Sequence, residues 1–138
     1  MWTLRTRRTS LSSQFPAVAS SLLINGTVLS HTSLIGPGHP NLHPFVWQFI
    51  DSLPQDQREN FSGTCAESAL ISDQLWQLDA HRGDGGHIGT EEAVSHFQGA
   101  AITSRMVRGH GDPDHGKPIT PCAACSSLLN ALRVRTIP

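Results

Sequence analysis

The stretch TPCAAC, residues 120–125, lies near the end of the chain and holds two of its three cysteines, Cys122 and Cys125. The stretch begins a predicted helix over residues 122–132, and Pro121 just precedes it, where a missing N–H costs nothing. Residues three apart share a helix face, so both sulfurs can reach one point. The positive end of the helix dipole favours thiolate over thiol. The stretch therefore predicts a cation site or a redox pair.

The third cysteine, Cys65, occupies a matching position. It opens residues 65–79, where apolar residues recur at helical spacing and predict the clearest helix of the chain. Two helix N-termini that each carry cysteine can face one another at the ends of a sheet. Three thiolates can bind zinc and leave the fourth tetrahedral position open for water, which is the arrangement of catalytic rather than structural zinc.

Glu67 follows Cys65 by two residues, so it cannot share the helix face of that cysteine. A carboxylate beside a metal can take a proton from water and return it to a substrate nitrogen. The combination of C-A-E with P-C-x-x-C has the logic of zinc deaminases, in which the glutamate is not a ligand. We therefore predict Glu67 as the catalytic proton carrier.

Each part of this pattern has another interpretation. Thr64-x-x-Glu67 also fits a helix capping box, and a lone Cys65 is most often a small buried apolar residue. The C-x-x-C pair also fits a thiol redox protein. A structural zinc site would need a fourth protein ligand, such as His110 or His115. Because all three cysteines lie at predicted helix starts, we favour the open metal site.

Strands and helices alternate along the rest of the chain. Asn25-Gly26 supplies the two positive φ angles of a type I′ turn, which predicts a β-hairpin over residues 22–29. An opening hairpin followed by interleaved helices and strands predicts a three-layer α/β sandwich or a helix-covered mixed sheet. The other expected elements are a short helix over 11–20, a loop over 35–44, a helix over 45–50 that stops near Pro54, a polar connection over 55–62, a loop over 81–90, a helical turn over 91–97, strands over 100–107 and 134–137, and a loop over 109–121.

Length and composition indicate an ordinary globular protein. The chain has 138 residues, 38% of them hydrophobic and 15% charged, with a net charge of -1, which argues against a general polyanion binder. No apolar run approaches the roughly 20 residues of a membrane span. An odd cysteine count without a recognisable secretory signal argues against a disulfide scaffold. We expect reduced thiols and a protein of the cytoplasm, or one that is delivered to a target cell.

The N-terminus is basic and rich in serine and threonine. Its composition also fits an organelle leader. Because the hairpin signal follows so closely, we favour a loose basic N-terminus over residues 1–15 and a single domain over residues 16–138.

Two stretches, GTCAESALISDQLW (63–76) and HGKPITPCAACSSLLNALRV (115–134), resemble the cytidine deaminase-like superfamily. More closely, they resemble the YwqJ-type deaminases, which occur as toxin domains in bacterial polymorphic toxins and in some eukaryotes. The likeness extends over the hairpin region 21–34, the helix region 42–54 and all of residues 63–134. The connection over residues 99–119 is what points to the YwqJ-type subgroup.

The resemblance implies a three-layer α/β/α sandwich whose mixed sheet of about four strands opens with a β-hairpin. It implies Zn²⁺ held by Cys65, Cys122 and Cys125, with Glu67 as the proton shuttle of a single deaminase domain. Cys65 stands where many relatives carry histidine, and a third thiolate should make the bound water less acidic. The implied reaction is hydrolytic removal of the amine at C4 of cytosine or C6 of adenine.

The leading substrate is cytosine in nucleic acid, either single- or double-stranded DNA or RNA, as in toxin-type relatives. Alternatives are a free nucleoside or nucleotide, or a non-catalytic zinc-stabilised binding module. The sequence after Gly99 contains five basic and two acidic residues. This surplus of positive charge fits either binding of a phosphate backbone or a solvated loop. We further expect a monomer, an immunity protein as a partner, and no membrane contact.

Contacts to the base are expected from backbone groups near Ala66 and near Thr120 and Pro121. His31 and Ser33, at the end of the second hairpin strand, are further candidates. A histidine in such a place is more often simply exposed. Few aromatic residues are available to stack on a base, and Phe61 or a loop histidine is the best candidate.

Overall fold

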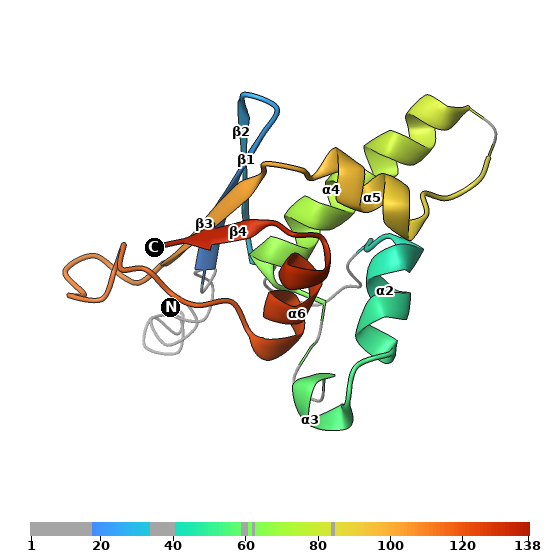
Figure 1. Cartoon of the computed structure of the whole chain (residues 1–138). Coiled ribbons are helices and arrows are strands. Elements are labelled where there is room, and N and C mark those ends of the chain that lie inside the picture. The colour runs from blue at the N-terminus through green and yellow to red at the C-terminus, as the bar shows by residue number, and fades with distance from the viewer. Residues whose placement is uncertain (1–17, 34–40, 59–60, 62, 84) are drawn as a thin grey trace, which may run out of the picture.

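The computed structural model describes residues 18–33, 41–58, 61, 63–83 and 85–138 (Figure 1). Four strands form one sheet in the order β2-β1-β3-β4, with β1 antiparallel to both neighbours and β3 parallel to β4. The elements in chain order are β1 (Val18–Ile24), β2 (Thr27–Thr32), α2 (Pro44–Asp51), α3 (Gln55–Arg58), α4 (Ala66–Arg82), α5 (Thr90–His96), β3 (Ala101–Met106), α6 (Ala123–Ala131) and β4 (Arg135–Ile137).

The hairpin turn is the one that the sequence predicts. Asn25 and Gly26 have φ angles of 51° and 77°, as a type I′ turn requires. The strands are longer than expected, since β1 begins at Val18. The predicted helix over residues 11–20 is therefore wrong for 18–20, because β1 pairs with β2 on one side and with β3 on the other. The rest of that prediction, and the expected loose N-terminus, lie outside the described residues.

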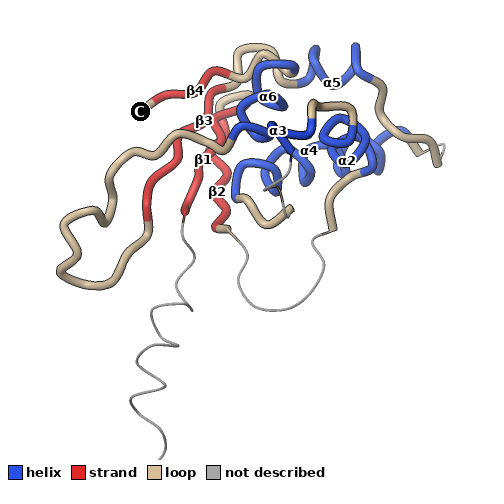
Figure 2. The backbone as a smooth tube through the Cα atoms, turned by 90° about the horizontal axis from the view of Figure 1, so that it is seen from below, coloured by secondary structure: helices blue, strands red, loops and turns tan. Residues whose placement is uncertain are grey.

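All labelled helices lie on one side of the sheet (Figure 2). The predicted α/β sandwich, with a mixed four-stranded sheet that opens with a hairpin, is confirmed. In the described part of the chain the helices form one layer rather than two. The described residues leave the other sheet face largely open, and Leu23 and Val28 are exposed there. The core is a single cluster between the sheet and the helices, and its largest members include Leu22, Ile71, Leu75, Phe97, Leu128 and Leu132.

The helices begin close to where the sequence places them. Cys65 is the N-cap of α4 and Cys122 is the N-cap of α6, each with extended backbone. Helix α4 ends at Gly83, whose φ of 74° is the left-handed conformation that favours glycine. The predicted polar connection over 55–62 is wrong in part, because α3 forms within it after Pro54. Among the described helices none is long and apolar enough to span a bilayer.

Candidate metal and catalytic site

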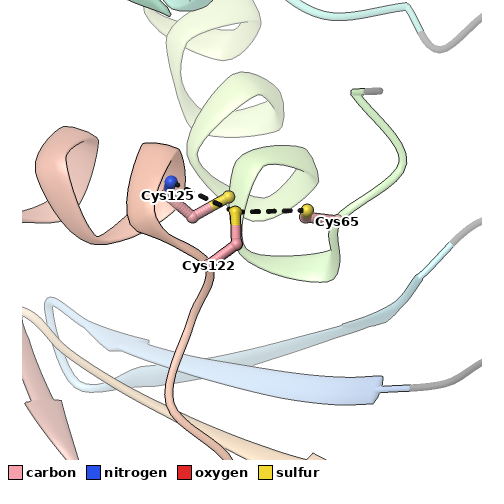
Figure 3. A group of neighbouring side chains, drawn as sticks. All are labelled: Cys65, Cys122 and Cys125. Atoms are coloured by element: carbon pink, nitrogen blue, oxygen red, sulfur yellow. Dashed lines mark hydrogen bonds between the residues drawn. The ribbon is translucent and has the colours of Figure 1, made fainter. Parts of the chain in front are cut away.

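The starts of α4 and α6 lie side by side (Figure 3). The Sγ atoms of Cys65 and Cys122 are 3.8 Å apart. With the buried Cys125, all three sulfur atoms lie within 4.8 Å of one another. The structure therefore brings together the three cysteines that the sequence proposes as metal ligands, although Cys65 and Cys122 are 57 positions apart in the sequence.

The C-x-x-C stretch folds as a helix cap. The N–H of Cys125 donates to the Sγ of Cys122 over 3.4 Å, and the hydroxyl of Ser126 donates to the carbonyl of Pro121 over 3.1 Å. The cysteine sulfur thus takes the place of the oxygen that serine or aspartate supplies at most N-caps. Negative charge on this sulfur is favoured because it faces the N-terminus of α6.

The three thiols compete for a single negative charge. Hydrogen bonds from the side chains of Cys125 and Cys65 lower the pKa of Cys122 far below its usual range. Donation to Cys122 raises the pKa of Cys65, and the same donation raises that of Cys125. One thiolate is therefore favoured and further ionisation is opposed. A divalent cation is what would allow all three to ionise, and soft thiolates are a donor set that fits zinc.

The cluster offers three potential protein ligands. Among the described residues no histidine, aspartate, glutamate or further cysteine joins the three sulfurs at ligand distance. His115, one candidate for a fourth ligand, instead accepts a hydrogen bond from the backbone N–H of Arg108 over 3.0 Å, and His110 is exposed. Three thiols with no fourth protein ligand fit an open, catalytic metal site better than a closed, structural one.

Glu67 lies in the first turn of α4 and is 4% exposed. Its Oε2 accepts a hydrogen bond of 2.7 Å from the hydroxyl of Ser104 on strand β3. The capping-box interpretation is wrong, because the N-cap is Cys65 rather than Thr64, and the Cys65 side chain makes no capping hydrogen bond. A buried carboxylate that faces the sheet, two residues from a thiol cluster, is a strong candidate for proton transfer.

A cavity of about 240 Å³ lies beside Ser104. It is bounded by residues 118–121 on one side and by strands β3 and β4 on the others, with Ile102 and Thr136 in its walls. Ser104 thus touches both the cavity and the carboxylate of Glu67. Because Ser104 links this cavity to Glu67, we take it as the candidate substrate pocket.

The five residues predicted to contact substrate fall into two groups. Thr120 and Pro121 line the cavity, and Ala66 is buried at the first position of α4, next to the N-cap cysteine. His31 and Ser33 lie elsewhere. The Nδ1 of His31 is 2.7 Å from the carbonyl of Thr32, and the Oγ of Ser33 accepts from the N–H of Val18 over 3.2 Å. Their substrate roles stay predictions.

A second group of potential ligands, His43, Asp79 and His87, was not anticipated from the sequence. Its ligand atoms also lie within 4.8 Å of one another. Asp79 Oδ2 is 2.6 Å from both His43 Nε2 and His87 Nδ1, and Asp79 Oδ1 accepts from the N–H of Ile88 over 2.7 Å. The only local signal is that His43 precedes Pro44, which marks it as a potential helix N-cap.

The model of the family described as YwqJ-like deaminase matches residues 5–134 of the chain. The match covers nearly the whole chain and includes the three cysteines, Glu67 and Ser104. No curated protein and no solved structure is significantly similar to the chain.

Proposed function

The chain belongs to the YwqJ-like deaminase family, and from this premise we propose that it is a zinc-dependent deaminase that removes the exocyclic amine of a nucleobase by hydrolysis. The leading substrate is cytosine in nucleic acid, with uracil and ammonia as the products. The observation that carries the proposal is the buried carboxylate of Glu67 beside three thiols at two adjoining helix N-termini.

Cys65, Cys122 and Cys125 would hold the metal. The N-terminus of α6 favours the thiolate form of Cys122, and the cap bond from the Cys125 N–H fixes its sulfur over the helix start. When bound, zinc would supply the Lewis acidity that makes water a nucleophile near neutral pH. The three-thiol cluster supports this role because no fourth protein ligand joins it within the described residues.

Glu67 would move the protons of the reaction. It takes one proton from the attacking water and gives it to the ring nitrogen, which makes the amine-bearing carbon more electrophilic. It then carries a proton to the amine, so that the C–N bond breaks and ammonia leaves. Burial of Glu67 supports this role, because few water molecules compete for its carboxylate.

The substrate base would enter the cavity beside Ser104. Its walls combine apolar contacts from Ile102 and Pro121 with the hydroxyl groups of Thr120 and Thr136, which suits a flat heteroaromatic ring with polar edges. The exposed Arg105 and Lys117 flank the connection that leads from β3 to this cavity. We infer from them a path for a phosphate backbone, and hence nucleic acid rather than a free nucleoside as substrate.

The family also supports a toxin-type role. We propose that the enzyme acts as a monomer in a target cell and that an immunity protein neutralises it. A base-modifying toxin would be harmful to its own producer, which is why a specific inhibitor is expected.

The test compares substrates with the zinc-loaded protein and its Glu67→Gln variant. Single-stranded DNA, duplex DNA, RNA, cytidine and adenosine are each incubated with both, and the products are sequenced or separated by chromatography. We expect cytosine-to-uracil conversion in a polynucleotide and a loss of roughly 100- to 10,000-fold in Glu67→Gln, with equal zinc content. A wild-type protein that binds zinc and converts none of these substrates would overturn the proposal.

A further inference from the structure

Two buried serines connect Glu67 to the sheet. The Oγ of Ser104 donates to Glu67 Oε2 over 2.7 Å, and the Oγ of Ser20 lies 2.7 Å from the Oγ of Ser104. Ser104 is 4% exposed and Ser20 is 2% exposed. The two serines face one another across β1 and β3, which pair Ser20 with Ser104. Two strands and one helix thus meet in a single line of hydrogen bonds.

The protons in this line have only one consistent arrangement. A serine hydroxyl carries one proton and can also accept hydrogen bonds. The only hydroxyl proton of Ser104 is used in the hydrogen bond to the carboxylate. In its contact with Ser20, Ser104 must therefore be the acceptor and Ser20 the donor. The hydrogen bonds therefore run in one direction, from Ser20 to Ser104 to Glu67.

Packing alone does not account for these two hydroxyls. The interface between α4 and the sheet is otherwise lined by apolar residues such as Leu22 and Ile102. Burying a hydroxyl is unfavourable unless its hydrogen bonds are made, and a hydrogen bond to a charged group is stronger than one between neutral groups. The burial of the two serine hydroxyls is therefore best explained by their hydrogen bonds, which end at the carboxylate of Glu67.

The hydrogen bonds from Ser20 through Ser104 hold only one of the two carboxylate oxygens of Glu67, Oε2. Among the described residues no hydrogen bond is made to Glu67 Oε1. Ser104 also forms part of the cavity wall, so its hydroxyl joins the carboxylate of Glu67 to the wall of the candidate substrate pocket. A carboxylate anchored through Oε2 has its remaining oxygen in a defined direction, as proton transfer requires.

We propose that Ser104, itself oriented by Ser20, is a positioning residue that anchors Glu67 through Oε2 and leaves Oε1 to exchange protons with the substrate. This inference rests on the proposed deaminase function. It assigns no direct contact with the reacting atoms to either serine.

The experiment uses two variants of similar shape in the zinc-loaded protein. Both variants add one methyl group to the serine side chain and fit a strand. Ser104→Thr keeps the hydroxyl, whereas Ser104→Val has a second methyl group in its place. We expect Ser104→Val to lower kcat roughly 10- to 100-fold with KM changed little, since a hydrogen bond to a charged group is lost. Ser104→Thr should retain most of kcat, and Ser20→Ala should lower it only a few-fold.

A second pair of serines supplies the matched control. Ser21 and Ser30 also face one another across two strands, with their Oγ atoms 2.8 Å apart, but the pair is on the open face of the sheet. Ser21→Ala should leave kcat unchanged. Zinc content and thermal midpoint are measured for every variant, to separate anchoring of Glu67 from loss of metal or of fold.

The possible outcomes distinguish the two proposals. If the wild-type protein deaminates its substrate and Ser104→Val matches it in kcat, the anchoring role is overturned and the deaminase function stands. Equal losses of kcat in Ser104→Thr and Ser104→Val would also overturn it, because the hydroxyl would then not matter. If the wild-type protein has no activity on any substrate, the proposed function itself fails.

Discussion

Two clusters in this molecule each bring three potential metal ligands within 4.8 Å of one another. One consists of Cys65, Cys122 and Cys125 at the starts of α4 and α6. The other consists of His43, Asp79 and His87 near the end of α4. Both clusters meet the same distance criterion, but they differ in the hydrogen bonds that their ligand atoms already make.

The sulfur atoms of the cysteine cluster make only weak hydrogen bonds to one another. Its sulfurs interact mainly with one another, so the pKa of Cys122 falls while those of Cys65 and Cys125 rise. Sulfur is a weak hydrogen-bond donor and acceptor, so little is lost when these contacts are replaced by metal–sulfur bonds. This cluster can gain from a cation.

The histidine cluster is already satisfied by hydrogen bonds. The Nδ1 of His43 accepts from the N–H of Phe45 over 3.0 Å, so Nε2 carries the ring proton and donates it to Asp79. A metal at Nε2 would require the proton to move to Nδ1, where it would oppose the Phe45 N–H. Ligand distance alone therefore does not identify a metal site, and the positions of the protons separate the two clusters.

The largest expected effect comes from breaking the cysteine cluster. Cys122→Ser should weaken zinc binding by more than about 100-fold, since even residues behind the ligands contribute 10- to 100-fold, and deamination should be lost with the metal. His87→Ala is the matched control, because it removes one member of the other cluster and should leave one zinc ion per chain. Competition with a chelator of known affinity measures both. Equal zinc affinity in Cys122→Ser and the wild type would contradict the assignment.

The next effect concerns stability rather than metal. His43 is 0% exposed, caps α2 and donates to Asp79. His43→Ala should therefore lower the free energy of unfolding by about 2–4 kcal/mol, from the lost cap and the lost hydrogen bond to a carboxylate. Urea denaturation measures the loss, and the zinc content of the folded protein should not change. A variant that loses zinc while it keeps its stability would show that His43 belongs to a metal site.

These two clusters also show how far the sequence could predict the site. Pro121 and the helical spacing of apolar residues are local signals, so the helix starts at Cys65 and Cys122 and the turn at Asn25 were predicted correctly. The contact between Ser104 and Glu67 joins residues 37 positions apart and depends on which strand lies under α4. The strand character of residues 18–20 likewise comes from pairing with β3, which no local pattern contains. Tertiary contacts of this kind override local propensity.

The smallest expected effect is a difference in acid stability. The carboxyl group of Asp79 is largely buried; desolvation would raise its pKa, but hydrogen bonds from His87, His43 and the Ile88 N–H together lower it. Folding therefore favours the ionised form. The stability that Asp79 contributes is present above its unfolded pKa of about 3.9 and is lost as the pH falls through its lower folded pKa.

Asp79→Asn removes this charge and keeps an oxygen acceptor. At neutral pH the variant should lose about 1–2 kcal/mol of unfolding free energy relative to the wild type, and the difference should shrink as the pH falls below about 4. Both proteins are compared by urea denaturation in the metal-free form, so that release of zinc by acid does not enter. A difference that is constant between neutral and acid pH would show that the ionised carboxylate is not what holds His43 and His87 together. The proton-based distinction between the two clusters would then fail.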